Sequence, residues 1–282
     1  MQGGVAFRPG PGRQAEVSGR GHALRPMVAH MSASRVPAAG LLFIGLLTLL
    51  ASSASGGEPQ PRRPVVVELY TSQGCSSCPP ADALLGQLAG RKNILAMTLP
   101  VTYWDMLGWR DTLATEANTQ RQKAYAKQLG RGGVFTPEII VDGMTDIIGS
   151  REQSVEGAIA AKAADVQAVP IRLAANHEQI RVAVGGAPEP AGAATIWLFG
   201  ILPQASVSIH NGENDGRTLT YRNVVRHIRA VGNWKGQPVN LTLARTEAGT
   251  PRESIAVVLQ QGGYGRVIGA AFIDRPTFSA MR

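Results

Sequence analysis

The only two cysteines of the chain lie between a run typical of a buried strand and a run typical of a helix. The run "PVVVELYTS" is β-branched and bounded by proline and turn residues, which predicts a strand over residues 65–70. After the cysteines, the leucines of residues 81–89 recur at helical spacing and Gly90 ends the pattern. Cys75 and Cys78 are therefore expected in a strand-to-helix turn. A Cys-x-x-Cys pair there is a redox centre, half of a zinc site, a haem attachment point or a tight disulfide.

The segments that follow continue the alternation of strand and helix. "NILAMTLPVTY" predicts a second strand, and "TLATEANTQRQKAYAKQLG" predicts a helix that ends at Gly130. "TPEIIVDGMTDIIGS" predicts two short strands joined at Asp142-Gly143, and a last helix runs to about Ala164. The order β-α-β-α-β-β-α predicts an α/β domain over residues 58–165. Parallel strands joined by helices place ligand chemistry at the carboxyl ends of the strands, where Cys75 falls.

From about residue 166 the hydrophobic pattern changes to period two. Eight alternating segments separated by glycine, proline and asparagine turns predict an antiparallel, sandwich-like β-rich domain or extension over residues 166–282. One loop, "NGENDGRTL", holds Glu213, Asn214 and Asp215, which suit a calcium site or a tight turn. The spacing of a calcium loop is absent, so a turn is favoured. This half carries no recognisable chemistry, and we expect it either to position a partner protein over the cysteines or to complete the core.

Residues 1–57 are predicted to be an extension followed by a signal peptide. An apolar core at about residues 37–51 follows Arg35 and precedes small residues, which is typical of a secretory signal and short for a membrane span. The alternative is an uncleaved anchor helix. Signal cleavage would leave the mature protein periplasmic or secreted, where cysteines can form a disulfide. Contact with the membrane is then expected only through the signal segment.

The charge of the chain argues against a nucleic-acid partner. The formal net charge is +8, but residues 1–57 hold five arginines and one glutamate, so the remainder carries +4. The remainder has no block of lysine and arginine interleaved with aromatic residues.

The residues near the cysteines argue against haem and against a metal. Haem attachment needs histidine after the second cysteine, and Pro79 occupies that position. Structural zinc needs four ligands, and the mature chain adds only His177, His210 and His227, none paired at ligand spacing. We therefore expect no metal and no cofactor. Redox chemistry and a structural disulfide stay open, and redox chemistry is favoured because closing so short a loop contributes only roughly 2 kcal/mol.

The order of strands and helices resembles the thioredoxin fold, and two motifs carry the resemblance. They are Cys75-Ser76-Ser77-Cys78 at the first strand-to-helix turn and Thr136-Pro137 before the third strand. The resemblance implies a cis bond before Pro137 and a backbone there that receives the substrate chain. It also implies a buried carboxylate that exchanges protons with the resolving cysteine. Glu68 is the candidate for this general base, and the alternative is a carboxylate at the strand end that faces water.

A closer resemblance is carried by five runs: "ELYTSQGCSSCPPAD", "YWDMLGWRD", "RQKAYA", "FTPEIIVDG" and "GENDGRTLTYRNVVR". They are similar to the secreted bacterial family called domain of unknown function 1223, and the similarity spans nearly the whole mature chain. It implies a thioredoxin-like fold and export, and it brings no activity with it.

Position suggests a role for each cysteine. Cys75, at the amino end of the predicted helix, is the expected nucleophile because free N–H groups and the helix macrodipole favour a thiolate. Cys78, one turn further on, is the expected resolving thiol. Pro79 and Pro80 follow at once, and we expect the regular helix to begin only around Pro80, which weakens the dipole at Cys75.

Trp104 belongs to the densest aromatic cluster of the chain, with Tyr103 and Trp109. Their loop follows the second predicted strand, so we expect it at the same edge of the sheet as the cysteines. There Trp104 walls the site or binds substrate together with Thr136 and Pro137. The alternative is aromatic packing beneath an insertion.

These observations predict an exported thiol-disulfide oxidoreductase-like protein. It exchanges disulfides with envelope or secreted proteins through Cys75 and Cys78, and it works with a redox partner protein. The alternative is a noncatalytic envelope binding or scaffold protein, on a thioredoxin fold with a structural disulfide. Neither the direction of electron flow nor the oligomeric state is predicted.

Overall fold

The structure is a computed structural model that describes residues 63–163, 168–187 and 192–274. The predicted extension and signal peptide, residues 1–57, lie outside the described residues. Within the described ranges, no helix is both long and apolar enough to cross a membrane.

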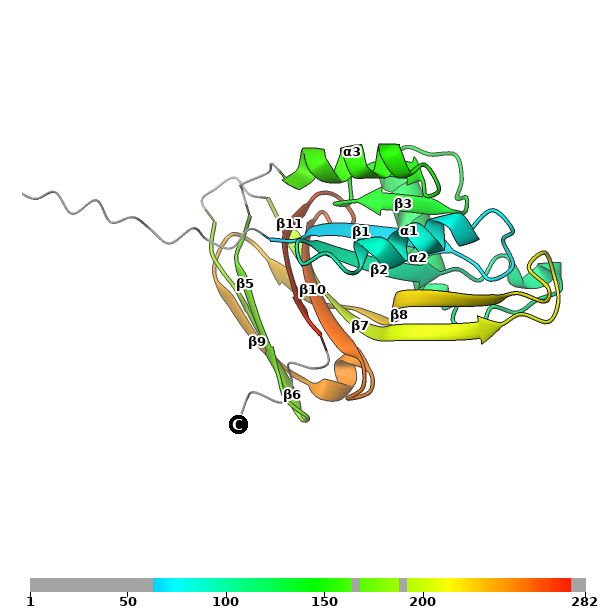
Figure 1. Ribbon diagram of the computed structural model, residues 1–282. Coiled ribbons are helices and arrows are strands. Elements are labelled where there is room, and N and C mark those ends of the chain that lie inside the picture. Colours follow the sequence, from blue (N-terminus) through cyan, green and yellow to red (C-terminus); the bar gives the residue numbers. More distant parts are fainter. Residues whose placement is uncertain (1–62, 164–167, 188–191, 275–282) are drawn as a thin grey trace, which may run out of the picture. The chain divides into compact units, whose positions relative to one another are not determined.

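The first half of the described chain alternates strands and helices in the predicted order (Figure 1). Its elements are β1 (Val65–Thr71), α1 (Pro79–Leu88), β2 (Ile94–Pro100), α2 (Glu116–Gln128), β3 (Glu138–Val141), β4 (Thr145–Ile148) and α3 (Glu152–Ala163). The second half consists of strands: β5 (Ile171–Ala175), β6 (Gln179–Val184), β7 (Ala194–Ser208), β8 (Thr218–Trp234), β9 (Val239–Ala244), β10 (Ser254–Gln261) and β11 (Val267–Ile273). Two short 3-10 helices, η1 (Asp105–Leu107) and η2 (Arg245–Ala248), lie in connections.

β1 is buried along its whole length, which explains its nearly unbroken apolar run. On one face of the sheet, Leu69 packs in a core cluster with Leu85 of α1. On the other face, Tyr70 packs with Tyr125 of α2, ring edge to ring face. β1 is therefore a central strand covered on both faces, and Glu68 is the one charged residue in it.

Eight strands form one mixed sheet in the order β11-β10-β7-β8-β2-β1-β3-β4. β1 pairs in parallel with β2 and antiparallel with β3. Because β1 and β2 run in the same direction, the loops that follow them leave at the same edge of the sheet. We call these loops the cysteine loop (residues 72–78) and the aromatic loop (residues 101–115). Their placement at one edge is as predicted.

The sequence suggests a boundary near residue 165, and the large sheet continues across it. β8 lies beside β2, where Thr98 pairs with Val224. The Thr98 hydroxyl donates to the carbonyl of Arg222 at 2.7 Å, and Asn223 Nδ2 donates to the carbonyl of Ala96 at 2.9 Å. The β-rich segment thus extends the sheet that the first half begins.

The second sheet is antiparallel, in the order β5-β6-β9. Ile180 and Val182 of β6 share a core cluster with Trp234 of β8 and Val257 of β10. Two sheets therefore share a buried apolar layer in this half, which is the sandwich-like part of the prediction. The fold is mixed α/β, with one large sheet and a second antiparallel sheet.

β7 is longer than the sequence pattern suggests. The segments "ATIWLFG" and "ASVSIHN" are predicted as separate strands, yet they form one strand of 15 residues. Pro203 lies between them and has no backbone N–H to donate to the ladder. The ladder passes over it, from the pair Leu202 and Val224 to the pair Gln204 and Arg222. Because of this continuity, β7 and β8 form a long hairpin.

Candidate functional site

The candidate site is the cysteine loop at the carboxyl end of β1. Cys75 and Cys78 form a disulfide, and the exposed fraction of both residues is 0%. The Cys75 backbone N–H donates to the carbonyl of Ser72 at 3.2 Å, and the Cys78 N–H donates to the carbonyl of Cys75 at 3.2 Å. Two successive turns therefore bring the cysteines together, while Ser76 and Ser77 between them are exposed.

α1 begins at Pro79, within one residue of the start expected around Pro80. Proline is tolerated there because the N–H groups of a first turn have no helical partner. Cys78 is the N-cap, and its carbonyl accepts the N–H groups of Ala81 and Asp82 at 2.9 and 3.1 Å. Cys75 lies three residues earlier, in the turn. The expectation that Cys75 occupies the helix end is therefore wrong, and the helix N–H groups act most closely on Cys78.

Asp82 is a buried acid one helical turn after Cys78, and sequence reasoning missed it. Residues four apart share a helix face, so the Asp82 side chain lies on the face of Cys78. Neither carboxylate oxygen has a hydrogen-bond partner among the described residues. Burial raises the pKa of Asp82 to about 7, and the charge of Asp111 raises it further. The available signal was an acid on the buried stripe of an otherwise apolar helix.

Two further buried groups lie in the surroundings of Asp82. The hydroxyls of Thr71 and Tyr221 also have no hydrogen-bond partner within the described ranges. Burial, together with the charges of Asp82 and Asp111, raises the pKa of Tyr221. Buried polar groups without partners are uncommon in folded proteins. Of these groups, Asp82 is the one whose ionisation falls near neutral pH.

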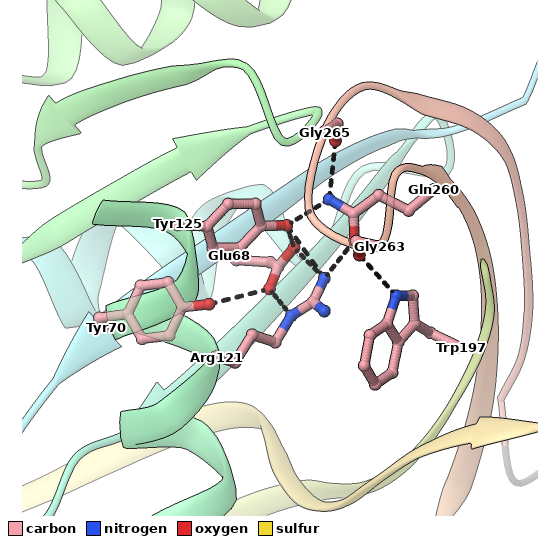
Figure 2. A network of polar contacts seen from close by, with 8 residues as sticks. All are labelled: Glu68, Tyr70, Arg121, Tyr125, Trp197, Gln260, Gly263 and Gly265. Carbon is pink, nitrogen blue, oxygen red and sulfur yellow. Dashed lines mark hydrogen bonds and ion pairs between the residues drawn. The ribbon is translucent and has the colours of Figure 1, made fainter. Parts of the chain in front are cut away.

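Glu68 is buried, as the resemblance implies, and it lies in a network of polar contacts (Figure 2). Its exposed fraction is 0%, so the alternative of a carboxylate that faces water is wrong. Arg121 Nε donates to Glu68 Oε2 at 2.6 Å and Arg121 Nη2 donates to Oε1 at 2.9 Å. The hydroxyls of Tyr125 and Tyr70 donate at 2.6 and 3.1 Å. Four donors therefore surround the carboxylate.

The same network joins the first half of the chain to the second. Gln260 of β10 accepts from Arg121 Nη2 at 3.0 Å and donates to the Tyr125 hydroxyl at 2.8 Å. The guanidinium of Arg121 also lies over four aromatic rings, those of Tyr125, Trp197, Phe199 and Tyr264. Glu68 thus completes a buried ion pair at a junction of helix and strands. Its side chain lies on the face of the sheet that α2 covers, whereas α1 covers the other face. Glu68 is therefore held in this network, whereas Asp82 lies in the first turn of the helix that Cys78 caps.

Trp104 brings the cysteine loop and the segment before β3 together. Its Nε1 donates to the Thr136 hydroxyl at 2.8 Å. A β-carbon added at Gly74 would lie 3.3 Å from the Trp104 β-carbon, so the two loops are in close contact. The peptide bond between Thr136 and Pro137 is cis, as predicted. The structure therefore assembles Trp104, Thr136 and Pro137 at the edge of the sheet where the cysteines lie.

The aromatic loop also supports the cysteine loop directly. Trp109 Nε1 donates to Gln73 Oε1 at 2.8 Å, and the Gln73 backbone N–H donates to Asp111 Oδ2 at 2.8 Å. In the same loop, Met106 is 85% exposed and Leu107 is 54% exposed. The aromatic loop therefore contacts the cysteine loop through Trp109 and Asp111, and it presents the apolar side chains of Met106 and Leu107 to solvent.

The turn between β7 and β8 is the part of the site that sequence reasoning missed most completely. Asn214 is fully buried, and its Nδ2 donates to the carbonyls of Gln73 and Cys75, both at 2.9 Å. Glu213 Oε2 accepts from the Ser76 N–H at 3.0 Å. Their loop is a turn between strands, as favoured, but its side chains contact a loop about 140 residues earlier in the chain.

Histidines do not gather at this edge. His210 contacts the ring of Trp109, with ring centroids 6.1 Å apart. Among the residues that the structure describes, no three His, Cys, Asp or Glu side chains are arranged to hold a metal ion.

The fold and the site together define a class of protein: mixed α/β proteins with a disulfide-bonded Cys-x-x-Cys turn at the end of a central strand. A comparison of the sequence with protein families identifies the family within this class. Residues 66–260 match the family described as "Protein of unknown function (DUF1223)". The chain belongs to this family, as its five characteristic runs suggested.

Two solved structures are similar to the chain. The X-ray crystal structure of protein AGR_C_4864 from Agrobacterium tumefaciens has 28% sequence identity and a TM-score of 0.68, and the similarity covers 79% of this chain and 98% of that chain. HBP35 of Porphyromonas gingivalis has 12% identity and a TM-score of 0.56, over 77% of this chain and 76% of that chain. At that identity the likeness concerns the fold alone. No curated protein matches the sequence.

Proposed function

We propose that the protein is an exported, thioredoxin-like thiol-disulfide oxidoreductase that exchanges disulfides with envelope or secreted proteins. The observation that carries the proposal is the disulfide between Cys75 and Cys78 in the turn from β1 to α1, with the unpaired acid Asp82 one helical turn further on. The order of strands and helices and the parallel pairing of β1 with β2 support the thioredoxin-like part. The apolar core at residues 37–51 supports export.

The exchange begins when a thiolate of a partner protein attacks Sγ of Cys75 and forms a mixed disulfide. The bond between Cys75 and Cys78 breaks, and its electron pair goes to Sγ of Cys78. A second thiolate of the partner then attacks the mixed disulfide, and Cys75 leaves as a thiolate. The partner dithiol has become a disulfide, and the cysteine pair has gained two electrons. Oxidation of the pair by a partner disulfide follows the same steps in reverse.

Asp82 supplies the proton in this scheme. Its pKa of about 7 keeps a fraction of the carboxyl groups protonated at neutral pH. When Cys78 leaves as a thiolate, the Asp82 proton moves to it and leaves a thiol and a carboxylate. In the reverse direction, the Asp82 carboxylate takes the proton from Cys78 before this sulfur attacks. The helix N–H groups at Cys78 add to the stabilisation of its thiolate.

Thr136, Pro137 and Trp104 are assigned to substrate binding. Thr136 and Pro137 offer their backbone to the incoming chain, as the resemblance implies, and Trp104 orients Thr136 through the indole hydrogen bond. A redox partner protein restores the starting state of the cysteine pair.

A noncatalytic binding or scaffold protein is the second candidate function. The complete burial of both cysteines favours it, because a structural disulfide needs no access to solvent whereas an exchanging one does. In that case the cysteine pair joins β1 to α1, and the fold presents its surface to another envelope protein.

Trapping of a mixed disulfide tests the choice between these functions. Cys78→Ser removes the resolving sulfur, so Cys75 is expected to form adducts with protein partners in cell extracts. The adducts should run as new bands on a non-reducing gel and disappear with dithiothreitol. The double variant Cys75→Ser/Cys78→Ser is the matched control and should form none. If the cells are oxidised before lysis and the Cys78→Ser protein in their extracts still carries no adducts, the result supports the scaffold function instead.

A further inference from the structure

Both sulfurs of the proposed site are closed to an attacking thiol. Disulfide exchange requires a thiolate to reach one sulfur directly. The exposed fraction of Cys75 and of Cys78 is 0%, although Ser76 and Ser77 between them are exposed. Some covering element must therefore move before the exchange of the proposed function can begin.

The turn between β7 and β8 is bound to the backbone of the cysteine loop on either side of Cys75. We call residues 209–217 the hairpin tip. Within it, Asn214 donates both amide hydrogens to the cysteine loop, one to the carbonyl of Gln73 and one to that of Cys75. Arg217 Nη1 donates to Asn214 Oδ1 at 2.9 Å, which orients the amide with its nitrogen toward the loop. The hydrogen bond from Asn214 to the carbonyl of Cys75 is thus specific and buried.

A second contact lies on the outer side of the cysteine loop. The exposed Glu213 accepts the N–H of Ser76 at 3.0 Å, and the Ser76 side chain and backbone both lower the pKa of Glu213. Behind it, Gly212 has a φ of 78° and lies against the side chain of Trp109 in the aromatic loop. The hairpin tip therefore binds the backbone of residues 73, 75 and 76 through side chains of two consecutive residues.

The arm that carries the hairpin tip is a two-stranded ribbon. Beyond the pair Gln204 and Arg222, the described strands β7 and β8 pair only with each other, and Figure 1 shows the ribbon reaching past its neighbours. The pairs along it include the exposed hydroxyls of Ser206 and Thr220, 2.8 Å apart. Leu113 of the aromatic loop packs in a small apolar cluster with Tyr221 and Val224 of β8. A ribbon of two strands is marginally stable by itself, so its position depends on contacts such as those of the hairpin tip.

We propose that the hairpin tip is a displaceable cover of the cysteine pair and that an extended polypeptide segment of the substrate takes its place. Displacement takes one hydrogen bond each from the carbonyls of Gln73 and Cys75 and from the Ser76 N–H, and a new partner can replace these bonds. A polypeptide backbone in extended form presents N–H and C=O groups along its edge and satisfies both kinds, whereas a small thiol does not. The substrate class is therefore a cysteine in a flexible or unfolded segment of an exported protein. This inference rests on the proposed function.

Reduction of the disulfide by a small phosphine tests the cover without any partner protein. Asn214→Ala removes both amide hydrogen bonds, and we expect the rate of phosphine reduction of the purified oxidised protein to rise about tenfold, because the closed state then lacks two buried hydrogen bonds. Glu213→Ala removes one solvent-exposed bond, so a rise of roughly twofold to threefold is expected. Free thiols are counted over time by alkylation and mass measurement.

Two matched controls distinguish the loss of the cover from a general loosening of the arm and from a change in the surface charge of the hairpin tip. Asp215→Ala removes the neighbouring exposed negative charge, and Ser206→Ala removes a hydrogen bond of the same arm that does not contact the cysteine loop. Both should stay within roughly twofold of the wild-type rate. Urea unfolding of each variant identifies any loss of the fold. Because Glu213 is exposed, Glu213→Ala is expected to stay folded.

The proposal is overturned if Asn214→Ala and Glu213→Ala reduce at the wild-type rate, or if Ser206→Ala accelerates reduction as much as they do. The second candidate function can still hold if the cover opens but no mixed disulfide is trapped in extracts. Conversely, trapped partners together with unchanged phosphine rates would keep the proposed function and reject the cover.

Discussion

Glu68→Ala is expected to lower the free energy of unfolding by about 3–5 kcal/mol, because it leaves the buried guanidinium of Arg121 without its carboxylate. The side chains of Glu68 and Arg121 are 1% and 2% exposed, so water cannot replace the missing oxygen atoms. The hydroxyls of Tyr70 and Tyr125 also lose their acceptor. The loss should appear in urea unfolding followed by circular dichroism.

The exposed ion pair of Arg131 and Asp146 provides the matched control. Its nitrogen and oxygen are 2.7 Å apart, close to the 2.6 Å of the buried pair, but the Arg131 side chain is 55% exposed. Asp146→Ala should cost no more than about 1 kcal/mol. If both variants lose equally little stability, the buried network does not join the halves of the chain as described.

Asp82→Asn is expected to remove a pH dependence of stability. The pKa of Asp82 is raised from 3.8 to about 7 by burial, so the folded protein keeps a proton that the unfolded chain releases near pH 4. The free energy of unfolding of the wild type should therefore fall as the pH rises from about 4 through 7, by up to on the order of 4 kcal/mol. Asparagine does not ionise, so the variant lacks this fall.

The measurement is urea unfolding of the oxidised proteins at several pH values between 4 and 9. The variant should gain stability relative to the wild type as the pH rises, with little change of the difference below pH 4. Glu138, next to Pro137, has a pKa that burial also raises to about 7, and its contribution is present in both proteins and cancels. A difference that stays constant across the pH range would show that Asp82 is ionised in the folded protein throughout.

Local patterns predicted the elements that place the cysteines. The β-branched run of β1 needed no other information, since a strand buried on both faces is apolar along most of its length, with Glu68 as its one charged residue. Asp142 and Gly143 were predicted as a hairpin turn, and both have a positive φ, 49° and 71°. Cys75 and Cys78 follow β1 at the predicted turn.

Contacts between residues far apart in sequence could not be predicted in this way. Asn214 occupies a turn that any polar residue suits, and nothing local indicates that its amide reaches the carbonyl of Cys75. Glu68 was considered only against the cysteines, because its partner Arg121 lies 53 residues away on α2. Asp82 differs, since its place on the buried stripe of the helix can be predicted from the spacing of the apolar residues around it.

The reduction potential of the Cys75–Cys78 pair tests the proposed exchange most directly. It is measured by equilibrating the purified protein in glutathione or dithiothreitol buffers of graded composition and counting the free thiols at each point. An exchanging pair is expected to have a potential above about −250 mV. A potential below about −300 mV would contradict the proposed function and identify the bond as structural.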